Sequence, residues 1–205
     1  MENFVTDKKE FEHYKSKIKK LFPEYLSFEK NSFNSNFKYF IAFDFDYIFE
    51  EIFFEGVIAF LNNIKNEKLF FYTIDPSPED YFFLHFNKYS VFELEINKNY
   101  DDFNNIIYKD PGENTADAIG INSNEISCFS NSNDWAIMGS REWEIAIVGF
   151  TSLEMKEKFL ISFKDNSDIF TSVEQQIDIL DDLLNFDNEL KSDYKKLIEN
   201  YQDRA

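Results

Sequence analysis

Residues 125–150 read EISCFSNSNDWAIMGSREWEIAIVGF, and short polar links separate the apolar segments within them. The pattern predicts three strands, over 125–130, 134–138 and 143–150, because Asn, Ser and Gly bound each apolar segment. Links of only a few residues favour antiparallel neighbours, since a parallel crossover needs a dozen or more. We therefore expect an antiparallel sheet built around these strands.

The chain before residue 125 supplies further strands and helices. Alternating and apolar runs predict strands over 39–46, 68–74 and 89–96. A first helix ends at Pro23, and residues 48–65 carry apolar side chains at helical spacing. The expected fold is α+β, with a mostly antiparallel sheet and flanking helices.

The C-terminal part of the chain reads as two helices. Thr171 and Glu174 have the spacing of a capping box at the start of the first. Each helix carries one apolar face, formed by Val173, Ile177, Leu180 and Leu184 in the first and by Leu190, Tyr194, Leu197, Ile198 and Tyr201 in the second. We expect residues 1–165 to form an α+β domain and residues 166–205 to form an acidic helical segment packed on it.

Charge is distributed unevenly along the chain. The 205 residues include 21 Lys+Arg and 39 Asp+Glu, for a formal net charge of −18. This balance argues against a nucleic-acid binder that neutralises phosphates, because that mechanism needs a basic face. The most acidic stretch, residues 165–190, holds eight acidic side chains and no Lys or Arg.

Two interpretations of this acidic stretch stay open. It is either a solvated helix face or an electrostatic docking surface for a basic protein partner. The candidate partner-binding acids are Asp178, Asp181, Asp182, Glu50 and Glu51.

Motifs for catalysis and cofactor binding are missing. The five glycines are never closer than eight residues, so neither a dinucleotide-binding motif nor a P-loop can be written. His13 and His85 are the only imidazoles, and neither has motif neighbours that suggest catalysis. We expect no catalytic residue, no metal site and no cofactor. A minor alternative is a magnesium or calcium site at Asp44, Asp46, Glu50 and Glu51, because carboxylates suit hard cations.

The sequence also bears on compartment. The single Cys128 cannot form an internal disulfide, which fits a reducing environment. No segment has the character of a signal peptide or the length of an apolar membrane-spanning helix. We expect a cytoplasmic protein that binds neither membranes nor nucleic acid.

Residues 41–46 read IAFDFD and resemble the first motif of haloacid dehalogenase-like phosphatases. The resemblance implies that Asp44 is the nucleophile, Asp46 the general acid and Thr73 the phosphate-binding residue, with a shared magnesium ion. The likeness ends after six residues, because Tyr47-Ile48-Phe49 stands where the family has a small, flexible turn. An aromatic strand with polar alternate positions explains both aspartates without catalysis.

Residues 131–150 point to a different family. They combine a polar turn, a strand with Trp, a charged turn and an apolar strand. This arrangement resembles a hairpin of bacterial immunity-protein-like families of polymorphic toxin systems, and Asp110-Pro111-Gly112 adds to the likeness, which lies mainly within 110–150. The resemblance implies an α+β build and a binding, inhibitory role without assigning a site.

Trp135, Arg141 and Trp143 lie around one predicted turn. Trp and Arg are common anchors of protein interfaces, so Trp135 and Arg141 are candidate partner-binding residues. The alternative is that the two Trp side chains are cross-strand core residues and that Arg141 pairs with Glu142 or Glu144.

The function that the sequence favours is non-catalytic binding, as an immunity-type inhibitor that neutralises a basic toxin domain. Toxins of the nuclease type are usually basic because their substrate is a polyanion, so an acidic partner complements them. The alternatives are a phosphatase that uses Asp44 and Asp46, and an interaction scaffold with no toxin partner.

Overall fold

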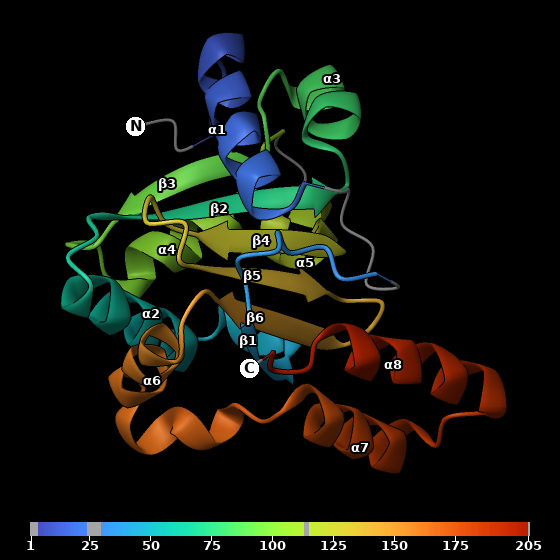
Figure 1. Ribbon diagram of the computed structural model, residues 1–205. Coiled ribbons are helices and arrows are strands. Elements are labelled where there is room, and N and C mark those ends of the chain that lie inside the picture. Colours follow the sequence, from blue (N-terminus) through green and yellow to red (C-terminus); the bar gives the residue numbers. More distant parts are fainter. Residues whose placement is uncertain (1–3, 24–29, 113–114, 205) are drawn as a thin grey trace.

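The computed structural model describes residues 4–23, 30–112 and 115–204. Its centre is a six-stranded sheet in the order β1-β6-β5-β4-β2-β3 (Figure 1). The strands are β1 (Tyr39–Asp44), β2 (Lys68–Asp75), β3 (Val91–Glu95), β4 (Glu125–Phe129), β5 (Trp135–Ser140) and β6 (Ile145–Phe150). All five strand pairs are antiparallel, which confirms the predicted α+β fold.

Helices cover both faces of the sheet. The longer ones are α1 (Lys8–Leu21), α2 (Glu51–Asn63), α4 (Tyr100–Ile107), α6 (Leu153–Ser162), α7 (Val173–Leu184) and α8 (Asn188–Asn200). The shorter ones are η1 (Phe45–Phe49), η2 (Pro78–Phe83), α3 (Leu84–Phe86), η3 (Thr115–Asp117), α5 (Ile119–Asn122) and η4 (Lys164–Ile169). None of the helices in the described part of the chain is long and apolar enough to cross a membrane.

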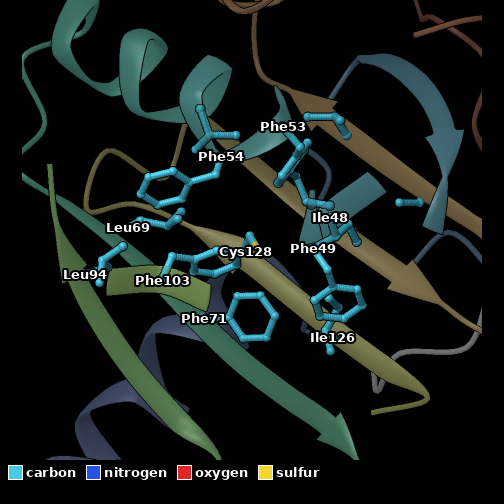
Figure 2. Packing of buried hydrophobic residues seen from close by; sticks show 14 of the residues in the cluster. Ile48, Phe49, Phe53, Phe54, Leu69, Phe71, Leu94, Phe103, Ile126 and Cys128 are labelled. Carbon is cyan, nitrogen blue, oxygen red and sulfur yellow. The ribbon is translucent and has the colours of Figure 1, made fainter. Parts of the chain in front are cut away.

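The alternation of side chains along the strands creates two cores. In β2, Leu69 and Phe71 belong to a buried cluster that includes residues of α2, α4 and α6, whereas Phe70 and Tyr72 belong to one that includes residues of α1, α7 and α8. Figure 2 shows the first of these clusters, in which the aromatic rings of Phe71, Phe103 and Phe54 lie together. Because successive residues of a strand point to opposite faces, a run of consecutive apolar residues fills both cores at once.

The C-terminal helices share the second core with α1. Ile177 of α7 and Leu197 of α8 belong to the same buried cluster as Phe11 and Tyr14. α7 begins at a capping box in which the Ser172 hydroxyl accepts the Gln175 N–H, one residue later than the predicted Thr171–Glu174 pair. The helical segment therefore packs on the sheet rather than standing apart from it.

Strand β1 is shorter than predicted. It ends at Asp44, and Asp46 lies in the 3₁₀ helix η1. The Asp44 carboxylate accepts the Asp46 N–H at 2.8 Å and so caps this helix. The alternation of Phe and Asp over 43–46 looks like a strand in sequence, but a capping side chain bends the backbone out of the sheet there.

The observed elements differ from the predicted ones at two further places, both in the second half of the chain. β5 runs through Ser140, so the turn before β6 is formed by residues 141–144, and Trp143 lies in that turn rather than in a strand. Helix α6, which the sequence pattern does not predict, begins where the Ser152 hydroxyl accepts the Met155 N–H.

The outer edge of β1 is covered by the segments that flank the C-terminal helices. Ala42 and Thr171 exchange two backbone hydrogen bonds of 2.9 Å. The Phe40 N–H donates to the Asp203 carboxylate at 2.7 Å, and Lys156 donates to the same carboxylate at 2.8 Å. The α7–α8 hairpin is therefore attached to β1 at both of its ends.

Candidate partner-binding surface

The α7–α8 hairpin carries most of the acidic residues that the sequence predicts to bind a partner. Over residues 173–191 it holds six acidic side chains and one basic side chain, Lys191. Asp178 and Asp182 are exposed on α7, and neither takes part in an ion pair within the ranges that the structure describes. These two carboxylates are available to a partner.

Asp181, unlike Asp178 and Asp182, makes contacts within the protein that stabilise the hairpin. Its carboxylate accepts the Phe186 N–H at 2.9 Å and pairs with Lys191 at 3.0 Å. Both contacts hold the loop between α7 and α8, where Asn185 adopts a left-handed backbone conformation. The three aspartates that the sequence groups together are thus divided into two exposed charges and one that fixes the hairpin.

Glu50 and Glu51 lie elsewhere on the molecule. Both are exposed at the N-terminus of α2, where a negative charge interacts favourably with the helix dipole. α2 packs on the face of the sheet opposite to α8. The structure therefore does not bring Glu50 and Glu51 together with Asp178 and Asp182, and their position has a sufficient structural explanation.

Trp135 is a core residue. It is fully buried in β5, its indole N–H donates to the Ser130 hydroxyl at 2.9 Å, and its ring lies edge-on to that of Phe60. The interpretation of Trp135 as an interface anchor is wrong, because the side chain has no surface to offer. Trp143 is half-buried in the turn, 5.0 Å from the Tyr194 ring.

Arg141 joins three segments at one end of the sheet. Its guanidinium donates to the carbonyls of Ser123 at 3.0 Å and Gly120 at 3.1 Å, and to the Asp46 carboxylate at 3.2 Å. It also lies over the ring of Phe45. The predicted pair of Arg141 with Glu142 or Glu144 is wrong, because the carboxylate that Arg141 contacts is that of Asp46. The planar, forked side chain of Arg suits such divided contacts.

The geometry separates the residues of the phosphatase hypothesis. β6, β5 and β4 lie between β1 and β2, which places Asp44 and Thr73 about 19 Å apart across the sheet at a strand spacing of about 4.8 Å. Thr73 is fully buried, and its hydroxyl lies 3.4 Å from that of Ser123. Asp44 caps η1 and Asp46 binds Arg141. These three side chains do not form a common site.

A carboxylate cluster lies at the same end of the sheet as Arg141. Glu125 is half-buried opposite Asp75 in the β2–β4 register. Burial raises the pKa of Glu125 to about 7, and the neighbouring charges of Asp75 and Glu142 add to the effect. The Asn124 amide donates to Asp75 at 2.7 Å. Glu125 therefore gains a proton near neutral pH in the folded state, and this couples stability to pH.

Reactive and metal-binding groups are dispersed. In the ranges 4–23, 30–112 and 115–204, no three His, Cys, Asp or Glu side chains are arranged to hold a metal ion. Cys128 is buried, and burial raises the pKa of its thiol. His13 and His85 are exposed on α1 and α3.

One hollow has the size of a small-molecule site. About 320 Å³ in volume, it lies between α1 and residues 77–80, and Ile18, Phe22, Tyr72 and Ile74 are among its lining residues. An ion pair between Lys15 and Glu79 crosses its rim. The residues that line it do not include His or Cys.

No family model, no curated protein and no solved structure matches this chain.

Proposed function

We propose that this protein is a non-catalytic acidic binding protein that docks on a basic protein and neutralises it, as an immunity protein does with its toxin. The observation that carries the proposal is the α7–α8 hairpin, whose exposed carboxylates at Asp178 and Asp182 stand on an element with a strong excess of acidic side chains. The proposal sets the protein in the bacterial cytoplasm, where the single Cys128 stays reduced.

Electrostatics supports this role. A surface of one charge sign attracts an oppositely charged partner over a distance and raises the association rate, whereas it contributes less to the lifetime of the complex. A nuclease-type toxin fits as the partner, because a protein that binds polyanions carries a basic surface. The dispersed titratable groups of this chain support binding rather than catalysis.

The test is co-purification of the protein from its native cytoplasm, followed by binding kinetics and an activity assay of the captured partner. We expect a basic partner whose activity falls on binding, and whose association rate falls steeply between about 50 and 200 mM salt. Charge reversal in the double variant Asp178→Lys/Asp182→Lys should slow association by roughly tenfold or more, with little change in the dissociation rate.

Asp181 is left unchanged in that variant because it holds the hairpin loop. The matched control is Glu55→Lys/Glu67→Lys, which changes the net charge equally at two exposed positions outside residues 165–190. Equal effects of the two double variants would show that only net charge matters. A partner that is acidic, or that keeps its full activity when bound, would contradict the proposal, and the latter result would favour an interaction scaffold.

A further inference from the structure

The apolar stripes of the α7–α8 hairpin extend beyond the domain they help to build. In α7 the stripe consists of Val173, Ile177, Leu180 and Leu184, and in α8 of Tyr201, Leu197, Tyr194 and Leu190. Both have the same spacing of i, i+4, i+7 and i+11, which places each set on one helix face. The first three residues of each stripe are buried, but the last of each is not.

The exposed ends of both stripes flank the loop between α7 and α8. Leu184 is 51% exposed and Leu190 is 46% exposed, and the hairpin projects past the edge of the sheet in Figure 1. On α7, Leu183 directly precedes Leu184 and is 74% exposed, and Ile179, about one turn before Leu183, is 45% exposed. We name these four residues the leucine tip: Ile179, Leu183, Leu184 and Leu190. Single exposed apolar side chains are common, but four on two consecutive helices are typical of an interaction surface.

The leucine tip is surrounded by negative charge. On α7, Asp178 precedes Ile179 and Asp182 precedes Leu183, and Glu189 precedes Leu190 on α8. The neighbouring Lys191 is paired with Asp181. A second copy of this chain would bring the same acids and a net charge of −18 against them, so self-association is disfavoured. The complementary occupant has an apolar patch that is flanked by Lys or Arg.

We infer that the leucine tip is the anchoring part of the docking surface, and that its partner presents an apolar surface with a basic rim. The inference rests on the proposed function and adds which residues of the surface set the association rate and which set the dissociation rate. The acids attract the partner and set the association rate, whereas the four apolar side chains become buried and set the dissociation rate. The expected pattern is that of other interfaces, in which a few apolar anchors provide most of the affinity.

The test uses the intact protein and two synthetic peptides of equal length and equal positive charge. One carries Lys with Leu at helical spacing, and the other carries Ser in place of every Leu. Titration calorimetry gives the two affinities, and amide NMR shifts locate the binding site. We expect the Leu peptide to bind at least about tenfold more tightly than the Ser peptide, with its shifts centred on residues 178–190.

Variants assign the difference to particular side chains. Leu183→Ser/Leu184→Ser should abolish the preference for the Leu peptide and leave binding of the Ser peptide unchanged. Ile161→Ser is the matched control, because Ile161 is 72% exposed on α6, outside the hairpin; it should keep the full preference. Asp178→Asn/Asp182→Asn should weaken both peptides by the same factor. Unfolding curves of all variants should match that of the wild type, since these positions are exposed.

The outcomes separate this inference from the proposed function. Equal affinity of the two peptides, or a preference that survives the double Leu variant, would overturn the inference and leave the electrostatic docking intact. Affinities that do not respond to the Asp variants would contradict the electrostatic docking. If neither peptide binds, both are contradicted.

Discussion

The substitution Phe60→Ala tests the packing of α2 against β5 and α6. The Phe60 ring lies in α2, is fully buried, and stands between β5 and α6. Its centroid is 5.3 Å from that of Trp135 and 5.1 Å from that of Phe159, and both pairs are edge-to-face. Truncation therefore removes a buried aromatic side chain and two aromatic pairs from the centre of one core.

The expected loss is about 3–5 kcal/mol, the usual cost of truncating a fully buried Phe. This is a large part of a typical unfolding free energy of about 5–15 kcal/mol. For a chain of this size it corresponds to a fall in Tm of roughly 6–20 °C, since each kcal/mol shifts Tm by about 2–4 °C.

Urea unfolding followed by circular dichroism and by tryptophan fluorescence measures the change, because Trp135 reports on this same core. The control is Ile52→Ala on the same helix, where the side chain is 42% exposed and the expected loss is below about 1 kcal/mol. If the unfolding curves of the Phe60 and Ile52 variants coincide with each other, α2 does not place Phe60 against β5 and the described packing is wrong.

Two further predictions concern the end of the sheet near Arg141. Between pH 4.5 and 7 the folded state holds a proton on Glu125 that the unfolded state has released, so the unfolding free energy should fall as pH rises through this window. The variant Glu125→Gln should remove this pH dependence and raise the unfolding free energy at pH 8 by about 1–3 kcal/mol. Urea unfolding at pH 5 and at pH 8 measures both effects. Arg141→Lys should cost about 1–3 kcal/mol and speed amide exchange in α5, because one ammonium cannot serve Ser123, Gly120 and Asp46 together. A slope that survives in the Gln variant, or an Arg141 variant as stable as the wild type, would refute the respective argument.

Local sequence patterns were sufficient for most of the fold. The short polar links within 125–150 encode antiparallel neighbours, and the apolar residues of α2 follow helical spacing closely. Helix α6 was missed because its pattern is blurred: Phe159 is fully buried, but Leu153 and Ile161 are apolar and exposed. A helix whose apolar residues point in several directions has no clear period to detect.

The candidate site was harder to predict because its contacts are long-range. Arg141 stood out in the sequence, but its carboxylate partner Asp46 lies 95 positions away. Asp181 looked equivalent to Asp178 and Asp182 until the loop that it holds was known. Leu184 continues the regular spacing of the buried stripe, so the spacing alone does not distinguish it from the buried Leu180.

The α7–α8 hairpin is attached to β1 at both ends, so its exposed tip can be replaced without changing the attachment points. Thr171 is hydrogen-bonded to Ala42 before the hairpin, and Asp203 accepts a hydrogen bond from Phe40 after it. The hairpin is therefore fixed to β1 at two points. Between those points the exposed residues of the leucine tip can be exchanged at little cost to the cores, because they belong to neither buried cluster. Grafting a different tip between the same anchor points should redirect recognition while the scaffold stays the same.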